Sequence, residues 1–554
     1  MPRAHHASLT LLGGLGLALA CAPLVGLAAR QPAAAGPRFD ISFSKDARAE
    51  PVTGRVYVAI SKENGRSTPI NQTSPTGVPI FAVAVSDLAP GQIAAVGPDD
   101  LGHPLRSLRD IPAGDYWVQP FVNVYTKFVR ADGHTVWLHM DQWEGQNWKR
   151  SPGNLFGDPV QVHFDPASSA PIVLVANKVI PPVDVPADTD SVKRIKIQSQ
   201  ILTKWWGHPI FLGAVVTLPE GYADRANVKY PVIYNEGHFS LGAPGGAGRA
   251  GGAGRGGQTA PTPPVTEAAP HFIQVTLQHP SPYYDDSYGV NSANNGPYGD
   301  AIMQELLPAV ETRFRVLREP WARILTGGST GGWIALAHQI FYPDFYGGAF
   351  ASCPDSVDFR YHQIVNIYQD PNAYFVDKGW MKLDRPDTRS PDGNITSNMK
   401  DENWFELVQG DHSRAGGQWD IWEATYGPVG ADGYPAPIWN KKTGDIDKNV
   451  AEYWKQHYDL RNILETQWST LGPKVANKLN VYVGDADTYY LNMGVHMLEN
   501  FLKTTDKPKW TGEIVFQPMA PHCWGPRGAE LTQKIVAQLD KYAPAGADLK
   551  SWRY

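Results

Sequence analysis

The chain has 554 residues, enough for two or three domains, and its 42% hydrophobic and 19% charged residues are typical of globular proteins with a full core. The net charge is −6 and no basic stripe runs along the sequence, which argues against a nucleic-acid partner. The 18 tryptophans and 24 tyrosines indicate aromatic-lined surfaces as well as core.

Residues 1–35 are typical of an export signal. Arg3 precedes an apolar run over residues 9–29, and the alanines at 33–35 offer a cleavage site. Cys21 suggests a lipoprotein anchor as an alternative, although the residue three positions before it is not the usual leucine. No other stretch reaches the ~18 apolar residues that a membrane span needs. We therefore expect an exported protein, periplasmic or secreted, without a membrane span.

Residues 36–183 alternate between short apolar runs and turns rich in proline and glycine. This spacing of short strands predicts an N-terminal β-sandwich domain. The segment 180–186 reads IPPVDVP and predicts a stiff linker at the domain boundary. The clearest expected strands are 56–60, 80–85, 116–122 and 160–164.

Residues 190–554 show a different pattern, in which later strands alternate with helical segments. This order predicts a second domain with a mostly parallel α/β sheet. Two insertions interrupt it: a Gly/Ala/Pro-rich loop over 241–264, and a tryptophan-rich segment over 354–473 that is long enough to form a lid or a substrate wall. The expected strands are 192–200, 210–218, 232–235, 272–277, 323–326, 349–352, 479–484 and 513–517, and the expected helices are 300–314, 332–341, 491–502 and 528–542.

The most informative stretch of this second domain is 321–333, which reads WARILTGGSTGGW. A strand-like run leads into a G-x-S-x-G match, and a helical pattern follows it. This is the context of a nucleophile elbow, in which Ser329 stands on a tight strand–helix turn. The same turn directs the amide of Thr330 towards the place where an oxyanion would form.

A serine nucleophile needs a base and an acid that orients the base. His522 follows the last expected strand and is the candidate base. After the preceding strand, Asp487 is the favoured acid and Asp485 the alternative; a metal site at these two aspartates is a weaker interpretation. The second oxyanion amide is expected from His238, after the strand 232–235.

The substrate is less well defined by the sequence. Tyr284, Asn291 and Trp333 are candidate contacts, and together with the tryptophan-rich insertion they suggest an aromatic and polar pocket. Phenolic, glycosidic or siderophore-like esters would fit such a pocket better than long lipid chains. A serine peptidase of similar triad order, and a binding protein on a hydrolase scaffold, are the competing interpretations.

From about residue 192 onward the chain resembles the putative-esterase family of α/β-hydrolases. The resemblance implies an α/β-hydrolase fold and a Ser-Asp-His hydrolase that uses no cofactor or metal. One departure is Glu236-Gly237, where the family often has His-Gly or Asp-Gly. The matching segments are 218–222, 230–234, 298–301, 305–308, the elbow at Ser329, 484–487 and His522.

Some secreted members of this family place cysteines beside both the serine and the histidine. Here Cys523 adjoins His522, but glycine precedes Ser329. The remaining cysteine of the exported chain, Cys353, ends the strand after the elbow helix. A Cys353–Cys523 disulfide that holds the histidine loop, or two buried thiols, are the two alternatives.

Overall fold

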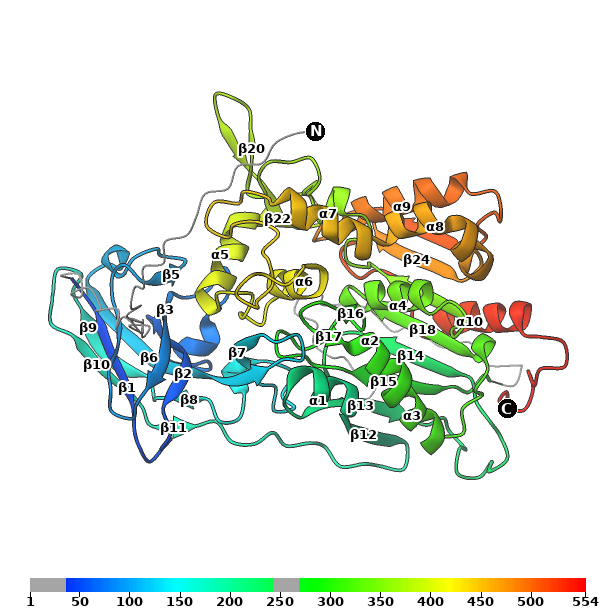
Figure 1. Cartoon of the computed structure of the whole chain (residues 1–554), viewed down its shortest axis with the longest axis horizontal. Coiled ribbons are helices and arrows are strands. Elements are labelled where there is room, and N and C mark those ends of the chain that lie inside the picture. The colour runs from blue at the N-terminus through cyan, green and yellow to red at the C-terminus, as the bar shows by residue number, and fades with distance from the viewer. Residues whose placement is uncertain (1–35, 243–268) are drawn as a thin grey trace, which may run out of the picture. The chain divides into compact units, whose positions relative to one another are not determined.

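The computed structural model describes residues 36–242 and 269–554 (Figure 1). The predicted export signal, with Cys21, and residues 243–264 of the glycine-rich loop lie outside the described residues. No described helix is both long and apolar enough to cross a membrane.

An eight-stranded sheet organises the second half of the chain, and all eight expected strands belong to it. Its spatial order is β12-β13-β15-β14-β18-β19-β24-β25. The first two pairings, β12 with β13 and β13 with β15, are antiparallel, and all later pairings are parallel. The strands are β12 (Val192–Ser199), β13 (Ile210–Thr217), β14 (Val232–Glu236), β15 (Ile273–Gln278), β18 (Arg323–Gly328), β19 (Gly348–Ser352), β24 (Leu479–Gly484) and β25 (Glu513–Gln517).

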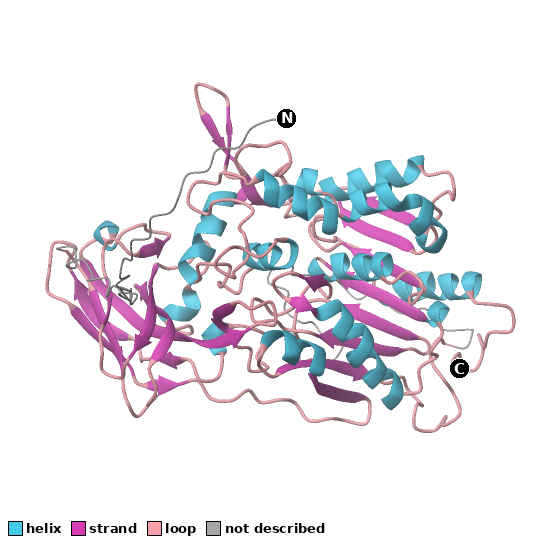
Figure 2. Cartoon of the chain, viewed as in Figure 1, coloured by secondary structure: helices cyan, strands magenta, loops and turns pink. Residues whose placement is uncertain are grey.

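Helices flank this sheet, as Figure 2 shows. The expected α/β-hydrolase type of fold is confirmed. The helix expected over 300–314 is divided by a π-helical turn at Ile302–Leu306, because Pro308 has no N–H to donate to the preceding turn. The helices are α1 (Gln200–Trp206), α2 (Tyr298–Ala301), α3 (Leu307–Arg313), α4 (Thr330–Phe341), α9 (Asn492–Thr504) and α10 (Gly528–Tyr542).

The N-terminal part consists of two β-sheets that enclose a common core of apolar side chains. One sheet has the order β10-β1-β4, and the other has the order β11-β8-β6-β2-β3-β5, with β7 and β9 also paired to the long strand β6. The strands are β1 (Phe39–Phe43), β2 (Val52–Ser61), β3 (Ile80–Leu88), β4 (Ala94–Val96), β5 (Leu101–His103), β6 (Gly114–Val129), β7 (Thr135–His139), β8 (Leu155–Phe156), β9 (Val160–Phe164), β10 (Ile172–Ala176) and β11 (Lys178–Val179).

The insertion over 354–473 is a packed structure with its own aromatic core. Around the buried His362, four tryptophan rings lie within 6.0 Å of its imidazole, centroid to centroid: Trp419, Trp422, Trp439 and Trp454. Its elements are the hairpins β20 (Phe375–Asp377) with β21 (Lys382–Asp384) and β22 (Pro386–Arg389) with β23 (Ile395–Asn398), and the helices α5 (Met399–Gln409), α6 (Gln418–Tyr426), α7 (Lys448–His457) and α8 (Leu460–Val475).

The N-terminal part shares buried contacts with the rest of residues 36–554. Phe128 on β6 and Leu138 on β7 belong to the core that the eight-stranded sheet forms with its helices. Tyr57 on β2 packs in one cluster with Val408 on α5. The buried Arg55 donates its Nε to the carbonyl of Val408 at 2.8 Å. The two parts therefore stabilise each other across the linker predicted at 180–186.

Removing residues 36–187 is expected to yield a poorly folded, aggregating chain, because the cut exposes the apolar faces that β6, β7 and β2 cover. The measurement is the yield of monomer in gel filtration, together with the cooperativity of thermal unfolding. A monomeric, cooperatively unfolding product would contradict this expectation.

A milder variant, Arg55→Met, should fold but unfold at lower temperature, because it leaves the buried Val408 carbonyl without its side-chain donor.

Candidate active site

Ser329 stands at the junction between β18 and α4, and its backbone has a conformation that residues other than glycine rarely adopt. Its φ is 58° and its ψ is −125°. The neighbouring glycines allow this turn to pack tightly. A Cβ on Gly331 would lie 2.0 Å from the Glu236 carbonyl oxygen, and a Cβ on Gly327 would lie 2.2 Å from the Gly331 carbonyl oxygen. The G-x-S-x-G pattern is therefore a steric requirement of this strand–helix turn.

The side chains of Ser329, His522 and Asp487 form one hydrogen-bonded chain. His522 Nε2 lies 3.0 Å from Ser329 Oγ, and His522 Nδ1 lies 2.8 Å from Asp487 Oδ2. Asp487 is fully buried, and its Oδ1 accepts backbone amides of Tyr489 and Leu491. This geometry lets the imidazole accept the serine proton while a fixed carboxylate holds its orientation.

Asp485 lies apart from this chain of hydrogen bonds. Its half-exposed side chain contacts His496 Nε2 at 3.2 Å instead of His522. The carbonyl of Asp485 accepts the side-chain amide of Asn492. Asp485 therefore belongs to the loop between β24 and α9, and of the two candidate acids only Asp487 touches the imidazole.

The two candidate oxyanion donors lie on adjacent elements. Thr330 is the first residue of α4, where helix amides have no partner inside the helix. His238 follows β14, which ends at Glu236. The buried carboxylate of Glu236 lies between two imidazoles: its Oε2 is 3.4 Å from His279 Nε2, and its Oε1 is 3.5 Å from His338 Nδ1. These contacts give Glu236 a structural role in shaping the turn before His238.

The His238 side chain is held by two neighbouring carboxylates. Its Nδ1 lies 3.0 Å from Asp285 Oδ1 and 3.3 Å from Asp286 Oδ2. Burial alone would lower the pKa of His238, but the two carboxylates outweigh that effect and hold this pKa well above its usual range. The two carboxylates therefore favour the protonated, cationic imidazole beside the loop that carries the candidate oxyanion amide.

This raised pKa predicts a pH-dependent contribution to stability. A histidine whose pKa is raised on folding stabilises the protein fully below its unfolded pKa of about 6.5, and the contribution is lost as the pH rises through the folded value. The difference in unfolding free energy between wild type and His238→Gln should thus be largest near pH 6 and shrink under alkaline conditions. Urea denaturation at a series of pH values measures it. A difference that grows with pH would contradict the assignment, and Asp285→Asn should weaken the same trend.

A disulfide joins Cys353 to Cys523, so of the two alternatives that the sequence left open, the structure has the bonded form. Cys353 directly follows β19, and Cys523 directly follows His522. The amide of Ser329 also lies 3.3 Å from Cys353 Sγ. The bond therefore anchors the histidine loop beside the turn that carries the serine.

Removing the disulfide with the double variant Cys353→Ala/Cys523→Ala should lower the free energy of unfolding by about 2–4 kcal/mol, because the bond closes a loop across 170 positions in the unfolded chain. The check is thermal unfolding of wild type and variant, each with and without a reductant. Reductant should lower the Tm of the wild type and leave that of the variant unchanged. Equal Tm values for the oxidised wild type and the variant would contradict a stabilising role.

Asp355 is a site residue that the sequence analysis missed. It lies two residues after Cys353, is 3% exposed, and its Oδ1 is 3.3 Å from Ser329 Oγ. The hydroxyls of Tyr288 and Thr330 both donate to its Oδ2. An aspartate just past the carboxyl end of a central parallel strand, the ligand-binding edge of such sheets, is the signal that could have identified it.

A cavity of about 500 Å³ opens at Ser329 and His522. Most of its wall comes from the insertion, and Pro75 of the N-terminal part also contributes to it. Among the described residues, neither lysine nor arginine lines it. The lining side chains that carry charge or an aromatic ring are His238, Tyr284, Asp355, Asp387, Glu402, Phe405, Glu406, Trp419, Trp422, Tyr489 and His522.

The three candidate substrate contacts have different positions. Tyr284 lines the cavity and donates its hydroxyl to Gln418 Oε1 at 3.0 Å. Asn291 is exposed on the short strand β16 (Asn291–Ser292), outside the cavity wall, and its Oδ1 accepts the amide of Asp300. Trp333 is fully buried on the inner face of α4, against Tyr288 and Tyr426. We therefore correct the expectation for Asn291 and Trp333: the former is a surface residue and the latter a core residue.

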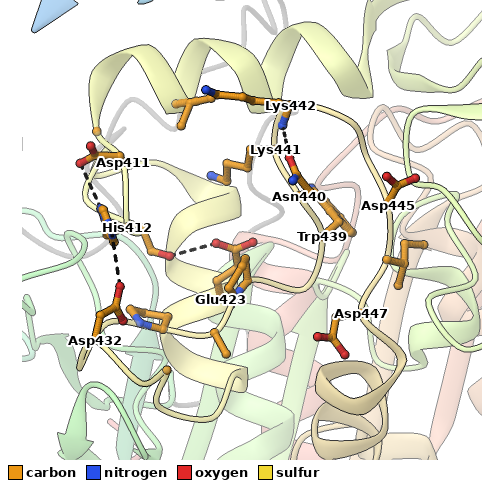
Figure 3. Close-up of a pocket in the computed structure, with 18 of the residues that line it drawn as sticks. Asp411, His412, Glu423, Asp432, Trp439, Asn440, Lys441, Lys442, Asp445 and Asp447 are labelled. Atoms are coloured by element: carbon orange, nitrogen blue, oxygen red, sulfur yellow. Dashed lines mark hydrogen bonds and ion pairs between the residues drawn. The ribbon is translucent and has the colours of Figure 1, made fainter. Parts of the chain in front are cut away.

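A second cavity, of about 970 Å³, lies within the insertion (Figure 3). Its described lining residues all lie between 407 and 447. Lys441 in its wall forms ion pairs with Asp420 and, at 3.1 Å, with Glu406, which also lines the cavity at Ser329. This ion-paired lysine therefore lies in the partition between the two cavities and connects α5 with α6.

Comparisons with known proteins place the chain in a family. The family model described as "Putative esterase" matches residues 212–522, which is 311 of the 554 residues. No curated protein sequence matches the chain significantly.

Solved structures with similar folds include a ferulic acid esterase (14% identity, 63% of this chain and 96% of that chain, TM-score 0.32). They also include an S-formylglutathione hydrolase from Agrobacterium tumefaciens (13% identity, 63% of this chain and 92% of that chain, TM-score 0.30). A third is a ferulic acid esterase from Anaeromyces mucronatus (14% identity, 63% of this chain and 93% of that chain, TM-score 0.26). With more than half of its length matched by the family model, the chain belongs to the putative esterase family and is a carboxylic ester hydrolase.

Proposed function

We propose that the protein is an exported serine esterase that works through an acyl-enzyme. The observation that carries this proposal is the hydrogen-bonded chain from Ser329 Oγ through His522 to the buried Asp487. The disulfide at Cys523 and the amides that hold Asp487 support it, because both fix the geometry that the reaction needs.

In the proposed reaction, His522 Nε2 takes the proton of Ser329 Oγ as the oxygen attacks the ester carbonyl. Asp487 stabilises the imidazolium that forms, and the amides of Thr330 and His238 donate to the oxyanion. His522 then passes the proton to the leaving alcohol. Water repeats the sequence on the acyl-enzyme: His522 takes its proton, the acid leaves, and the proton returns to Ser329.

For the substrate we propose a small ester with an aromatic or polar, sugar-like or siderophore-like component. The aromatic rings of Tyr284, Phe405 and Trp422 in the cavity wall support an aromatic component. The carboxyl groups of Asp387 and Glu402 support hydrogen-bond donors on the substrate. A cavity of about 500 Å³ suits a small molecule better than a long lipid chain.

The test is turnover of p-nitrophenyl acetate by the full chain, with and without a fluorophosphonate probe, followed by peptide mapping. Label on Ser329 that abolishes turnover supports the serine esterase. Folded protein that shows no turnover and takes no label, or takes label on another residue, would overturn it.

Export is proposed from residues 1–35 alone. Expression in a bacterial host should yield protein outside the cytoplasm that begins near residue 36, as N-terminal sequencing can establish. A chain that stays in the cytoplasm with Met1 or residue 2 at its start would contradict export.

A further inference from the structure

The starting point is the buried carboxyl group of Asp355, which is held rigidly at one of its two oxygens. Its Oδ2 accepts the Tyr288 hydroxyl, the Thr330 hydroxyl at 3.2 Å and the Gln418 side-chain amide at 3.3 Å. The Tyr288 oxygen in turn accepts the indole N–H of Trp422 at 2.6 Å. This network orients the carboxyl group, so the direction of its second oxygen is set by the fold.

The second oxygen, Oδ1, points at the nucleophile. Its one hydrogen bond in the described structure comes from Ser329 Oγ, at 3.3 Å. The same hydroxyl lies 3.0 Å from His522 Nε2, and its single proton serves only one of the two acceptors at a time. Once that proton passes to His522 and Ser329 is acylated, Oδ1 of Asp355 loses its one protein donor, which is unfavourable unless water or a group of the substrate replaces it.

The position of Oδ1 defines which part of the substrate can supply that donor. In an acyl-enzyme, an atom attached to the α carbon of the acyl group is separated from Ser329 Oγ by the carbonyl carbon and the α carbon alone. An acceptor 3.3 Å from Oγ is therefore within hydrogen-bonding reach of an α substituent.

The rest of the cavity favours a positively charged donor. Asp387 and Glu402 add two more carboxyl groups to the wall, and no lysine or arginine of the described chain lines it. The positive charge that His238 brings to the wall is paired with the carboxylates of Asp285 and Asp286. Burial raises the pKa of Asp355, Asp387 and Glu402, and a cation placed among them would favour their ionised forms. Trp419, Trp422 and Phe405 add aromatic side chains to the wall, and aromatic rings also attract ammonium groups.

We propose that the acyl group of the substrate carries an α-ammonium, so that the enzyme hydrolyses α-aminoacyl esters with Asp355 as the residue that binds the ammonium. This inference rests on the proposed serine esterase function and narrows its substrate class. It makes Asp355 a specificity-determining residue, distinct from the triad of Ser329, His522 and Asp487.

The experiment compares three methyl esters that differ at the α carbon: phenylalanine, 3-phenyllactate and 3-phenylpropionate, which carry an ammonium, a hydroxyl and a hydrogen. Acid release is followed by chromatography at a pH where the amine is protonated. In wild type, kcat/KM for the phenylalanine ester should exceed that for the 3-phenylpropionate ester by at least about tenfold. In Asp355→Asn this ratio should fall towards one. Asp485→Asn, on the loop outside the cavity, is the matched control and should keep the wild-type ratio.

A second measurement does not depend on the folding of a variant. Phenylalaninamide and 3-phenylpropanamide are compared as competitive inhibitors of p-nitrophenyl acetate turnover by wild type, and the amine should bind at least about tenfold more tightly. Equal inhibition, or equal turnover of the three esters, would overturn the proposal. A hydroxyl ester that matches the ammonium ester would overturn the requirement for charge.

The same preparation separates this inference from the function on which it rests. Absent p-nitrophenyl acetate turnover and absent labelling of Ser329 would count against the serine esterase itself. Turnover and labelling without a preference for the ammonium would count against the role of Asp355 alone.

Discussion

Replacing Ser329 with alanine is expected to lower kcat for ester hydrolysis by about 10³- to 10⁶-fold, because the variant cannot form the acyl-enzyme. The remaining rate would come from water attack on substrate held near the oxyanion amides. The measurement is steady-state turnover of p-nitrophenyl acetate by wild type and variant at equal concentrations of folded protein. Because Ser329 is only partly buried and its hydroxyl contributes little to packing, the Tm of the variant should stay close to that of wild type.

A suitable control for this variant is Ser169→Ala, which changes an exposed serine of the N-terminal part. It should retain wild-type turnover, and the fluorophosphonate probe should inhibit it as it inhibits the wild type. Normal turnover by Ser329→Ala, in protein that the probe no longer labels there, would show that another group is the nucleophile.

Replacing Asp487 with asparagine is expected to lower kcat by about 10⁴-fold, whereas Asp485→Asn should change it by less than about threefold. The amide of asparagine can donate to His522 Nδ1 and so favour the wrong tautomer, which leaves Nε2 protonated and unable to accept the proton of Ser329. Asp485 contacts His496 and not His522, so its replacement leaves the imidazole unaffected.

The two variants make the same chemical change at positions two residues apart, so the ratio of their kcat values shows which aspartate orients the imidazole. Turnover is measured for both at several pH values, since a tautomer effect persists across the neutral range. A larger loss in Asp485→Asn than in Asp487→Asn would reverse the assignment of the acid. Far-UV circular dichroism and Tm should be recorded for both, because Asp487 also accepts two backbone amides and its replacement costs some stability.

Local patterns were sufficient to predict the sheet and the serine turn. Each of the eight strands is a short apolar run between turn residues, and such runs depend mainly on their own residues. The turn at Ser329 is predictable because the backbone approaches its glycines too closely for any side chain. A Cβ on Gly331, for example, would lie 2.0 Å from the Glu236 carbonyl oxygen. His522 follows from chain order alone, since it is the histidine that comes after the last strand.

Other features follow from packing between segments far apart in the chain, and sequence patterns contain little information about it. The helical period placed Trp333 near the serine, but the side of α4 on which it lies faces the core, against Tyr288 and Tyr426. Asn291 follows a sheet strand, yet the short hairpin of β16 with β17 (Gly296–Pro297) leaves it exposed, outside the cavity wall.

The sequence by itself therefore determined the fold class, the nucleophile turn and the loops from which a base and an acid would come, because these depend on local periodicity and on chain order. Only the tertiary structure decided that Cys353 and Cys523 are bonded, that Asp487 rather than Asp485 reaches the imidazole, and that the insertion walls the cavity. It also decided that Asp355 faces Ser329. Each of these depends on distances between side chains brought together from separate loops, and the packing of the whole chain sets those distances.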